Sequence, residues 1–348
     1  MKALTVAPGV AGSARLEDRD EPSAGAGELL VRGLAVGVCG TDREIVAGTY
    51  GWAPPGRDRL VLGHESVGEV LDAPDGVGFS PGDRVVGMVR RPDPVPCPAC
   101  AVGQWDMCRN GRYTEHGIKE LDGFAAGRFV LAADAAVAVP TTVGDLAVLV
   151  EPTSVVAKAW DHIDRIGARA AWSPRRVLVT GAGPIGLLAA LLAAQRGYDV
   201  HVLDIVTEGP KPALARALGA TYHSGSASDV GVDADIVVEC TGVGQVVLDV
   251  LGRTAPAGIV CLTGVSSGGH HLRIDAGALN RELVLENVVV FGSVNANAHH
   301  YHAAVEALAR ADRGWLAQLV TRRVSLSDWP SALQRHDQDI KVVVDLDQ

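Results

Sequence analysis

Short apolar runs separated by turn residues dominate the chain up to about Glu151. These runs are residues 1–6, 28–32, 67–71 and 83–87. Short strands between turns are typical of all-β or mostly β folds, so this part predicts a compact, mostly β domain. Residues 90–127 lack the regular pattern, and we expect them to form a lobe made of loops.

Beyond this point strand-like and helix-like runs alternate along the chain. Strands are predicted at residues 176–180, 199–204, 235–240, 258–263 and 287–292, and helices at 153–166, 186–196, 212–219 and 245–253. Such alternation is typical of a doubly wound parallel sheet covered by helices. A helix at 303–310 and a strand at 341–344 follow, and we expect this tail to fold back on the first domain.

The predicted fold class is therefore α/β, with two domains. The mostly β domain would comprise residues 1–153 and 298–348, and the doubly wound domain residues 154–297. A chain of 348 residues is long enough to give each domain a sizeable core.

Composition and charge limit the kinds of molecule that this chain is expected to bind. The formal net charge is −10 and aromatic residues make up 4% of the chain, whereas nucleic-acid binding needs a basic face or a stacking platform. The N-terminus lacks the long apolar region of a signal peptide, and no apolar run is long enough to span a membrane. We therefore expect a cytoplasmic protein that binds neither nucleic acid nor membrane.

A predicted strand and a predicted helix are joined by the glycine-rich loop Gly181-Ala182-Gly183-Pro184-Ile185-Gly186. The strand–loop–helix context makes this pattern a strong signature of a dinucleotide site. Gly181 would permit the tight turn, Gly183 would let the pyrophosphate approach the helix N-terminus, and Gly186 would let helix and strand pack closely. A glycine-rich turn without a ligand is the alternative.

Asp204 ends the next predicted strand, 18 residues after Gly186. A carboxylate there can accept hydrogen bonds from ribose hydroxyls and would repel a 2′-phosphate. Since no arginine or lysine occupies the next three positions, the sequence favours NAD over NADP, with NADP as the alternative. Thr241, Gly264 and Asn295 follow later strands of this domain and complete the predicted cofactor-binding residues.

Residues with metal-ligand side chains lie in separate segments, at Cys39, His64, Glu65 and Glu151. Zinc takes sulfur, nitrogen and oxygen ligands, and a catalytic zinc keeps one position open. Adjacent strand residues point to opposite faces, so His64 and Glu65 can both ligate only if the chain turns at Gly63; otherwise one binds and the other supports it. Each residue alone fits a buried thiol or a polar pair, but together they predict a catalytic zinc site. Thr41 and Glu65 are the predicted catalytic residues, with Thr41 accepting the proton of a bound alcohol.

Residues 63–68 (GHESVG) and 81–85 (PGDRV) resemble the zinc signature of the zinc-dependent medium-chain alcohol dehydrogenase family. With residues 39–42 (CGTD) and the loop at Gly181, the resemblance covers essentially the whole chain. It implies a GroES-like catalytic domain and a Rossmann domain, with zinc and nicotinamide in the cleft between them.

Three further segments, residues 113–124, 151–155 and 292–295, resemble the glucose 1-dehydrogenase branch of this family. By that resemblance Glu115 and Asn295 would hydrogen-bond sugar hydroxyls, Thr41 would also contact the substrate, and Glu151 would lie by the zinc. A sugar needs several fixed polar partners, which agrees with this assignment. An exposed loop acid and a turn asparagine are the alternatives for Glu115 and Asn295.

The cysteines at Cys97, Cys100 and Cys108 resemble the structural zinc lobe of the same family, which usually has a fourth cysteine where this chain has Pro94. A closed structural site needs four donors, and the adjacent Asp93 could supply an oxygen, so a structural zinc stays an open question. The run at residues 299–302 (HHYH) is predicted to be a solvated helix start, and Cys240 and Cys261 to be core residues.

Together these features predict zinc-dependent oxidation of an aldose, D-glucose or a close relative, at C1 to the lactone, with hydride transfer to NAD or NADP. The alternative with the same chemistry is a polyol, secondary-alcohol or amino-alcohol dehydrogenase. A non-catalytic NAD-binding protein is the rival from another class. We expect a homo-oligomer, a dimer or a tetramer, in which the apolar run at 288–291 extends a sheet between subunits.

Overall fold

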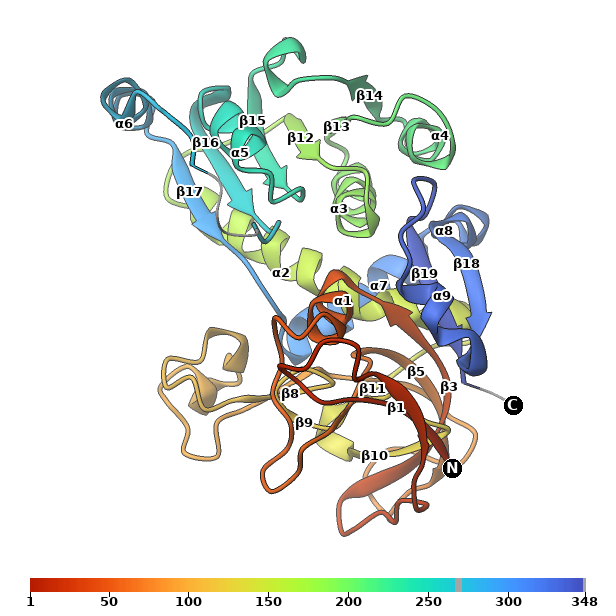
Figure 1. The fold of residues 1–348 in the computed structure, drawn as a ribbon. Helices are drawn as coiled ribbons and strands as arrows, with labels where there is room; N and C mark the ends of the chain where they lie inside the picture. Colours follow the sequence, from red (N-terminus) through yellow and green to blue (C-terminus); the bar gives the residue numbers. More distant parts are fainter. Residues whose placement is uncertain (267–270, 347–348) are drawn as a thin grey trace. The chain divides into compact units, whose positions relative to one another are not determined.

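The computed structural model describes residues 1–266 and 271–346. They form two compact units, one of Met1–Ser154 with Asn295–Gln348 and one of Val155–Val294 (Figure 1). We call them unit 1 and unit 2. The predicted domain boundaries, after residues 153 and 297, lie close to these limits.

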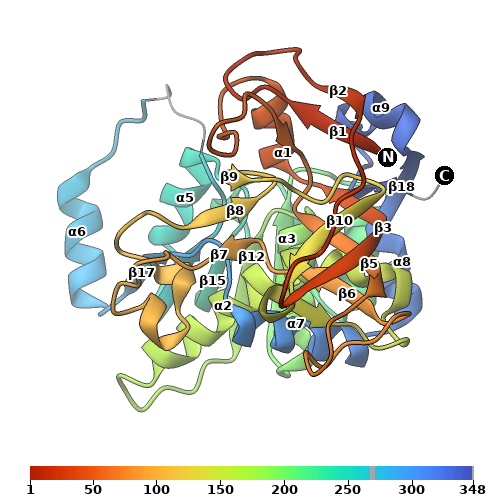
Figure 2. The same ribbon diagram turned by 90° about the horizontal axis from the view of Figure 1, so that it is seen from below.

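Unit 1 is built around one long strand, β3 (Glu28–Val38), whose side chains alternate between buried and more exposed positions along its first half. One edge of β3 pairs with β5 (Glu65–Asp72), and the other with β10 (Arg128–Ala132) and β19 (Lys341–Asp345). Figure 2 shows β3, β5 and β10 side by side. The strand order is β11-β6-β5-β3-β19-β18, where the others are β6 (Arg84–Gly87), β11 (Ala136–Ala138) and β18 (Val320–Ser325).

The register of these strands brings distant chain segments to one end of β3. Gly37 lies opposite Glu65, and Val38 lies opposite the second residue of β19. Because β3 is antiparallel to both neighbours, its last residues meet their first residues. Cys39, Glu65 and Lys341 therefore lie at the same end of this sheet.

Two small sheets complete the strands of unit 1. One has the order β2-β1-β4, with β2 (Arg15–Asp18), β1 (Lys2–Val6) and β4 (Leu60–Val61). The other has the order β7-β8-β9, with β7 (Arg90–Arg91), β8 (Thr114–His116) and β9 (Glu120–Leu121).

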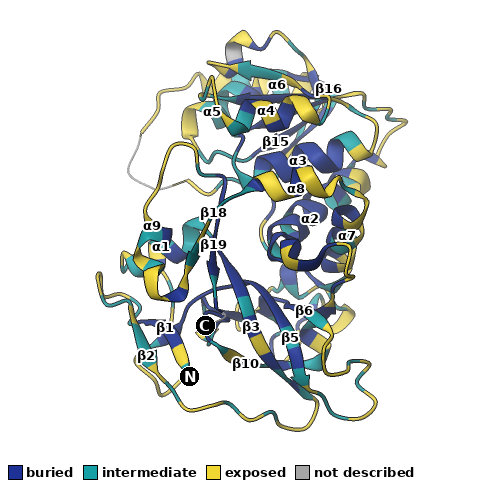
Figure 3. Cartoon of the chain, turned by 90° about the vertical axis from the view of Figure 1, so that its right-hand side faces the viewer, coloured by how far each residue is buried: buried dark blue, intermediate teal, exposed yellow. Residues whose placement is uncertain are grey.

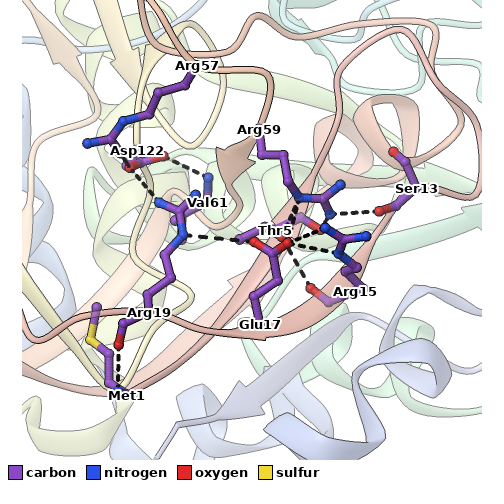
Figure 4. Close-up of polar contacts among 10 residues, drawn as sticks. All are labelled: Met1, Thr5, Ser13, Arg15, Glu17, Arg19, Arg57, Arg59, Val61 and Asp122. Atoms are coloured by element: carbon purple, nitrogen blue, oxygen red, sulfur yellow. Dashed lines mark hydrogen bonds and ion pairs between the residues drawn. The ribbon is translucent and has the colours of Figure 1, made fainter.

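A polar cluster ties the second small sheet to the first (Figure 4). The Asp122 carboxylate accepts hydrogen bonds from the Val61 backbone N–H at 2.9 Å, from Arg57 at 2.7 Å and from Arg19 at 3.3 Å. Val61 ends β4, three positions before His64, so this cluster fixes the approach to that histidine.

Unit 2 contains one sheet of parallel strands in the order β14-β13-β12-β15-β16-β17. These are β14 (Thr221–Ser224), β13 (Asp199–Asp204), β12 (Arg176–Thr180), β15 (Ala234–Glu239), β16 (Thr254–Leu262) and β17 (Val289–Gly292). This order, in which the chain starts in the middle and winds outward both ways, is that of the dinucleotide-binding sheet. The predicted α/β class with a doubly wound sheet is thus confirmed.

The helices of unit 2 differ sharply in burial. Among the described residues they are α2 (Val150–Gly167), which belongs to this unit from Val155 onward, α3 (Pro184–Gln195), α4 (Pro210–Ala217), α5 (Gly244–Leu251) and α6 (Ala276–Leu285). Residues 186–193 of α3 are all buried, as its dark colour in Figure 3 shows, because Ala and Leu cover every side of this helix. The helix α6 has no buried residue at all.

Several elements were not predicted from the sequence. Among them are the short helices α1 (Gly40–Val46), α8 (Arg313–Leu319) and α9 (Trp329–Leu333), the helix α6, the strands β14 and β18, and the small sheet of β7, β8 and β9, which lies where a lobe made of loops was predicted. The strand β14 (TYHS) has no apolar run, since it is an edge strand held mainly by its pairing with β13. The helices predicted at 153–166 and 303–310 begin earlier, as α2 (Val150–Gly167) and α7 (Ala298–Arg310).

Short 3-10 turns occur at Cys100–Val102, Trp105–Met107, Ala133–Ala135, Gly144–Leu149, Ala227–Asp229 and Leu326–Asp328. Among the described residues, none of the helices combines the length and the apolar character that crossing a membrane requires.

Candidate functional site

Cys39 lies directly after β3 and serves as the N-cap residue of α1. Its backbone N–H donates to Asp42 Oδ2 at 2.8 Å, so the first turn of the helix closes back on the cysteine. This turn fixes the thiol at the end of the sheet. Thr41 Oγ1 lies 3.9 Å from Cys39 Sγ.

His64 stands at a sharp turn before β5. Gly63 there has a φ of +89°, which a residue with a side chain rarely adopts. His64 and Asp42 are both buried, and His64 Nδ1 lies 3.4 Å from Asp42 Oδ1. Burial by itself lowers the pKa of His64, but the Asp42 carboxylate and Cys39 outweigh it and raise that pKa well above its usual value.

Glu65 is held by a buried lysine. Lys341 Nζ donates to Glu65 Oε1 at 2.6 Å and to Oε2 at 2.5 Å, and both side chains are 2% exposed. Burial lowers the pKa of Lys341, but the Glu65 carboxylate outweighs it and raises that pKa. A Cβ atom at Gly37 would lie 2.0 Å from Glu65 Oε2, so only glycine leaves room for this pair.

The ligand atoms of Cys39, His64 and Glu65 all lie within 4.8 Å of one another. The turn at Gly63 thus brings both adjacent residues, His64 and Glu65, into this cluster, as ligation by both would require; metal binding by both of them stays a prediction. Glu151 lies in the first turn of α2 outside this group. Burial raises the pKa of Glu151 to about 7, with His64 opposing the rise and Glu65 adding to it. These charge interactions mean that Glu151 lies near the cluster.

Sequence reasoning missed two partners of this cluster, Asp42 and Lys341. Asp42 belongs to the CGTD segment at residues 39–42, but nothing in the sequence indicated that its carboxylate faces His64. Lys341 lies 276 positions from Glu65. One feature of the sequence could have indicated it: Lys341 is the first residue of the apolar run KVVV, and a lysine that is buried in such a strand needs a partner of opposite charge.

The predicted sugar segment packs against the turn at Gly63. Phe124 donates its backbone N–H to Gly63 O at 2.9 Å, and a Cβ atom at Gly117 would lie 2.5 Å from the same oxygen. Glu115, in β8, is buried and accepts a hydrogen bond from Asn295 Nδ2 at 2.7 Å. Both predicted sugar-binding side chains therefore meet within unit 1. Asn295 has a φ of +63°.

The nucleotide loop of unit 2 has the geometry that its sequence predicts. Gly181 has a φ of +88°, and a Cβ atom at Gly186 would lie 1.7 Å from Gly181 O. A Cβ atom at Gly183 would meet nothing within 4 Å, so space is open in front of this residue. Pro184 and Ile185 begin α3, and Gly183 is its N-cap.

Asp204, at the end of β13, holds the same loop. Its Oδ2 accepts a hydrogen bond from the Ala182 backbone N–H at 2.6 Å, and its Oδ1 accepts one from Val206 at 3.0 Å. Each carboxylate oxygen has two lone-pair sites, so hydrogen bonds to a ribose remain open to it.

Thr241 and Gly264 are organised by a residue that the sequence reasoning missed, the fully buried Glu239. Its Oε1 accepts from the Thr241 backbone N–H at 2.7 Å and from Thr180 Oγ1 at 3.2 Å, and its backbone oxygen accepts from Gly264 N–H at 3.0 Å. Glu239 therefore links the ends of neighbouring strands of the sheet.

A second group of metal-type side chains, made of three thiols, lies within residues 90–127 of unit 1. One ligand atom each of Cys97, Cys100 and Cys108 lies within 4.8 Å of the others. The backbone N–H groups of Arg109 and Cys100 lower the pKa of Cys97 to about 6. Asp93 is not part of this group within the described residues; its carboxylate instead accepts from Val95 N–H at 2.8 Å and pairs with Arg112 at 3.4 Å. The suggested fourth ligand thus gains no support.

The histidine run at 299–302 does open a helix, α7, but the prediction that it is solvated is wrong for two of its residues. His300 and Tyr301 are buried, and the Tyr301 hydroxyl accepts a hydrogen bond from Val89 N–H at 3.1 Å. Packing within unit 1 explains this difference, since the first turn of α7 buries His300 and Tyr301 there. Cys261 is buried, as predicted, whereas Cys240 is only partly buried; burial raises the pKa of both thiols.

Comparisons with known proteins agree with this geometry. The family model described as "Glucose dehydrogenase C-terminus" matches residues 144–346, and the "Alcohol dehydrogenase GroES-like domain" matches residues 25–141. The chain is 43% identical to "Glucose 1-dehydrogenase 2" of Vulcanisaeta moutnovskia over 356 residues, covering 100% of both chains. It is 39% identical to "Glucose 1-dehydrogenase" of Methanocella arvoryzae, with 99% of both covered.

A solved structure also matches over the full length. It is the Haloferax mediterranei glucose dehydrogenase in complex with NADP, Zn and gluconolactone, at a TM-score of 0.92 and 34% identity, covering 100% of both chains.

Proposed function

Because the chain belongs to the glucose dehydrogenase branch of the medium-chain alcohol dehydrogenase family, we propose that it oxidises an aldose, D-glucose or a close relative, at C1 to the lactone. A zinc ion and a nicotinamide dinucleotide would assist the reaction. The observation that carries the proposal is the meeting of Cys39, His64 and Glu65 at one end of β3.

The donor set fits zinc. Cys39 offers sulfur, His64 offers nitrogen, and a carboxylate comes from Glu65 or Glu151. Asp42 faces His64 Nδ1, which leaves Nε2 as the ring nitrogen for a metal. Since Lys341 engages both oxygens of Glu65, we propose that Glu151 approaches the metal as well, either directly or through water.

Each residue has a distinct part in the proposed reaction. A bound zinc ion would lower the pKa of the C1 hydroxyl. Thr41 Oγ1, 3.9 Å from Cys39 Sγ, would accept the proton of that hydroxyl as the C1 hydride leaves for the nicotinamide. Glu115 and Asn295 would bind other sugar hydroxyls, and Lys341 would hold Glu65 in its charged form.

The function is tested by assaying purified protein for reduction of NAD or NADP with D-glucose, with zinc measured in the same sample. We expect glucose-dependent turnover, bound zinc and release of the lactone. A panel of linear polyols and secondary alcohols provides the contrast. Activity confined to that panel would overturn the proposed substrate class.

For the cofactor we propose NAD as the preferred form, with NADP also accepted. The argument is Asp204, whose charge repels a 2′-phosphate, followed by Ile205, Val206 and Thr207 with no cation to hold one. The Haloferax mediterranei enzyme binds NADP, so the preference has to be measured in this chain. The ratio of kcat/KM for the two cofactors decides it, and a higher value for NADP would refute the preference.

For the assembly we propose a homo-oligomer joined through β17. This strand is the last in the sheet order of unit 2, and its one pairing among the described residues is with β16. Val290 is 37% exposed, and Val284 and Leu285 at the end of α6 are 65% and 60% exposed. A second copy adding its own β17 would cover this apolar edge. Light scattering should give a dimer or larger, and Val290→Lys should shift it to monomer; a monomeric parental protein would exclude the interface.

A further inference from the structure

Arg90, in β7, is a buried arginine whose guanidinium contacts several groups at once. It is 7% exposed. Its Nε donates to Glu115 Oε1 at 3.0 Å, its Nη2 lies 2.9 Å from the same oxygen, and its Nη1 donates to the backbone oxygen of Asp106 at 3.0 Å. The guanidinium carbon also lies 3.7 Å from the centre of the Tyr113 ring.

We propose that Arg90 is a positioning residue that fixes the Glu115 carboxylate for recognition of a sugar hydroxyl. This inference rests on the proposed function, because it assigns Glu115 to the substrate. The contacts of its Nε, Nη1 and Nη2 atoms go to Glu115 and Asp106, and the side chain is buried, so we assign Arg90 to holding Glu115 rather than to contacting the sugar.

The two oxygens of Glu115 are used differently. Oε1 is held by Arg90 and by Asn295 Nδ2, which donates at 2.7 Å. Within residues 1–266 and 271–346, Oε2 has no hydrogen-bond partner, yet it is not sealed from solvent. Oε2 is therefore the oxygen that can accept a hydrogen bond from a bound sugar. With Oε1 fixed on one side, the orientation of Oε2 is set before the sugar arrives.

The support extends beyond this pair. Asp106, whose backbone oxygen Arg90 contacts, also accepts from Asn297 Nδ2 at 2.7 Å through its Oδ1. Asn297 and Asn295 belong to one short stretch before α7, so two bonds from that stretch converge on the Arg90 network. Asp106 lies two positions before Cys108, so the chain connects this hydrogen-bond network directly to the cluster of three cysteines.

The planar guanidinium suits this task better than a lysine would. It presents several N–H groups in a rigid fork and can stack on an aromatic ring while donating on both sides. A single ammonium in its place keeps the charge beside Glu115, but it does not reach Asp106 and Glu115 with the same geometry. The Arg90→Lys variant therefore keeps the positive charge beside Glu115 but loses the geometry that orients the Glu115 carboxylate.

The test compares steady-state kinetics of Arg90→Lys and Arg90→Met with the parental enzyme. We expect KM for glucose to rise about 10- to 100-fold in Arg90→Lys, as for loss of one or two charge-assisted hydrogen bonds. The kcat should stay within about 3-fold and the dissociation constant of the nucleotide should stay unchanged, since neither depends on Glu115. Arg91→Met is the matched control, because the neighbouring Arg91 pairs with Asp134 on the surface and should leave KM as it was.

A double-mutant cycle with Glu115→Gln separates positioning from direct binding. If Arg90 acts through Glu115, the double variant Arg90→Lys/Glu115→Gln has the KM of the worse single variant. Multiplying effects would mean that Arg90 binds sugar itself, and a parental KM in Arg90→Lys would mean that it has no part; either result overturns the inference.

Folding and function are controlled separately. If Arg90→Met does not fold, Arg90→Lys still carries the test. If the parental protein oxidises no aldose, the proposed function fails on its own account. Crystal structures of parental and Arg90→Lys protein then decide the inference: a displaced Glu115 carboxylate supports it, and one in the parental position overturns it.

Discussion

The nucleotide loop of unit 2 and the metal-type cluster of unit 1, called below the nucleotide half and the metal half of the chain, are assembled in different ways. In unit 2 one continuous loop, residues 181–186, supplies the turn, the open space and the helix N-terminus. In unit 1 the metal-type side chains come from Cys39, His64 and Glu65, and the charge that balances them comes from Lys341. The loop depends on local backbone shape, whereas the cluster depends on strand register and buried charge. The two halves should therefore fail in different ways.

The largest expected effect concerns the metal half alone. Cys39→Ser replaces a thiolate with a hydroxyl, a much poorer zinc ligand, and we expect kcat to fall by about 1,000-fold or more. Zinc content should fall with it. The dissociation constant for the nucleotide should stay within about 2-fold, because residues 181–186 belong to unit 2. Zinc analysis and nucleotide titration by fluorescence measure both.

The control for this substitution is Cys261→Ala, which removes a buried thiol from β16. It should lower stability modestly and leave zinc content and kcat near their parental values. Cys39→Ser protein with parental turnover of glucose would show that the cluster has no part in the chemistry.

The next effect is on stability and tests buried charge in the metal half. Lys341→Met leaves the Glu65 carboxylate buried without its cation, and we expect the free energy of unfolding to drop by about 3 kcal/mol. Adding Glu65→Gln should recover part of this loss, because the unpaired charge is then gone. Urea unfolding of metal-free protein measures both variants.

A matched surface pair sharpens this measurement. Lys2 and Asp18 are 2.7 Å apart, but their side chains are 55% and 79% exposed. Lys2→Met should change the free energy of unfolding by no more than about 0.5 kcal/mol. Equal losses in Lys2→Met and Lys341→Met would contradict the role given to burial.

The corresponding change in the nucleotide half is steric. Gly186→Val places a side chain where a Cβ atom would lie 1.7 Å from Gly181 O, so the loop must move. We expect the nucleotide to bind about 100-fold more weakly, because the loop and the N-terminus of α3 no longer fit the pyrophosphate. Zinc content should stay as in the parental protein. Gly277→Ala, in the exposed helix α6, is the control and should not change binding; tight binding by Gly186→Val would contradict the assigned site.

The same contrast explains what could be predicted from the sequence. The strands at Arg176–Thr180 and Asp199–Asp204 and the loop between strand and helix follow from local patterns, and their bounds were predicted correctly. The metal-type residues were also found, because each lies in a recognisable motif. Lys341, the partner of Glu65, and Arg90, the partner of Glu115, were not found, since each is brought to its carboxylate by strand pairing.

Other errors share a physical cause. The short helices α8 and α9 lack a long apolar period: α8 has the Asp312 side chain as its N-cap, and α9 begins with a proline in its first turn and buries Ala332. The buried His300 and Tyr301 look polar in sequence, and only the fold supplies the partners that allow their burial. Asp93, suggested as a substitute ligand from its position beside Pro94, has a carboxylate that contacts Val95 and Arg112 and lies outside the group of three thiols, so its role as a ligand stays a prediction.

The smallest effect concerns the segment that packs beside the metal half. Burial is the main cause that lowers the pKa of His116 to about 4, although a hydrogen bond to Asp122 O opposes it. The unfolded chain, with its histidine near the ordinary value of about 6.5, binds the proton more readily between these two values. Stability from the neutral ring is therefore present above pH 6.5 and lost as the pH falls towards 4. Urea unfolding across this pH range should show that the free energy of unfolding falls less steeply in His116→Gln than in the parental protein. The control His302→Gln, at an exposed position, should show the parental pH dependence. The same pH dependence in all three proteins would mean that His116 does not cause the loss of stability.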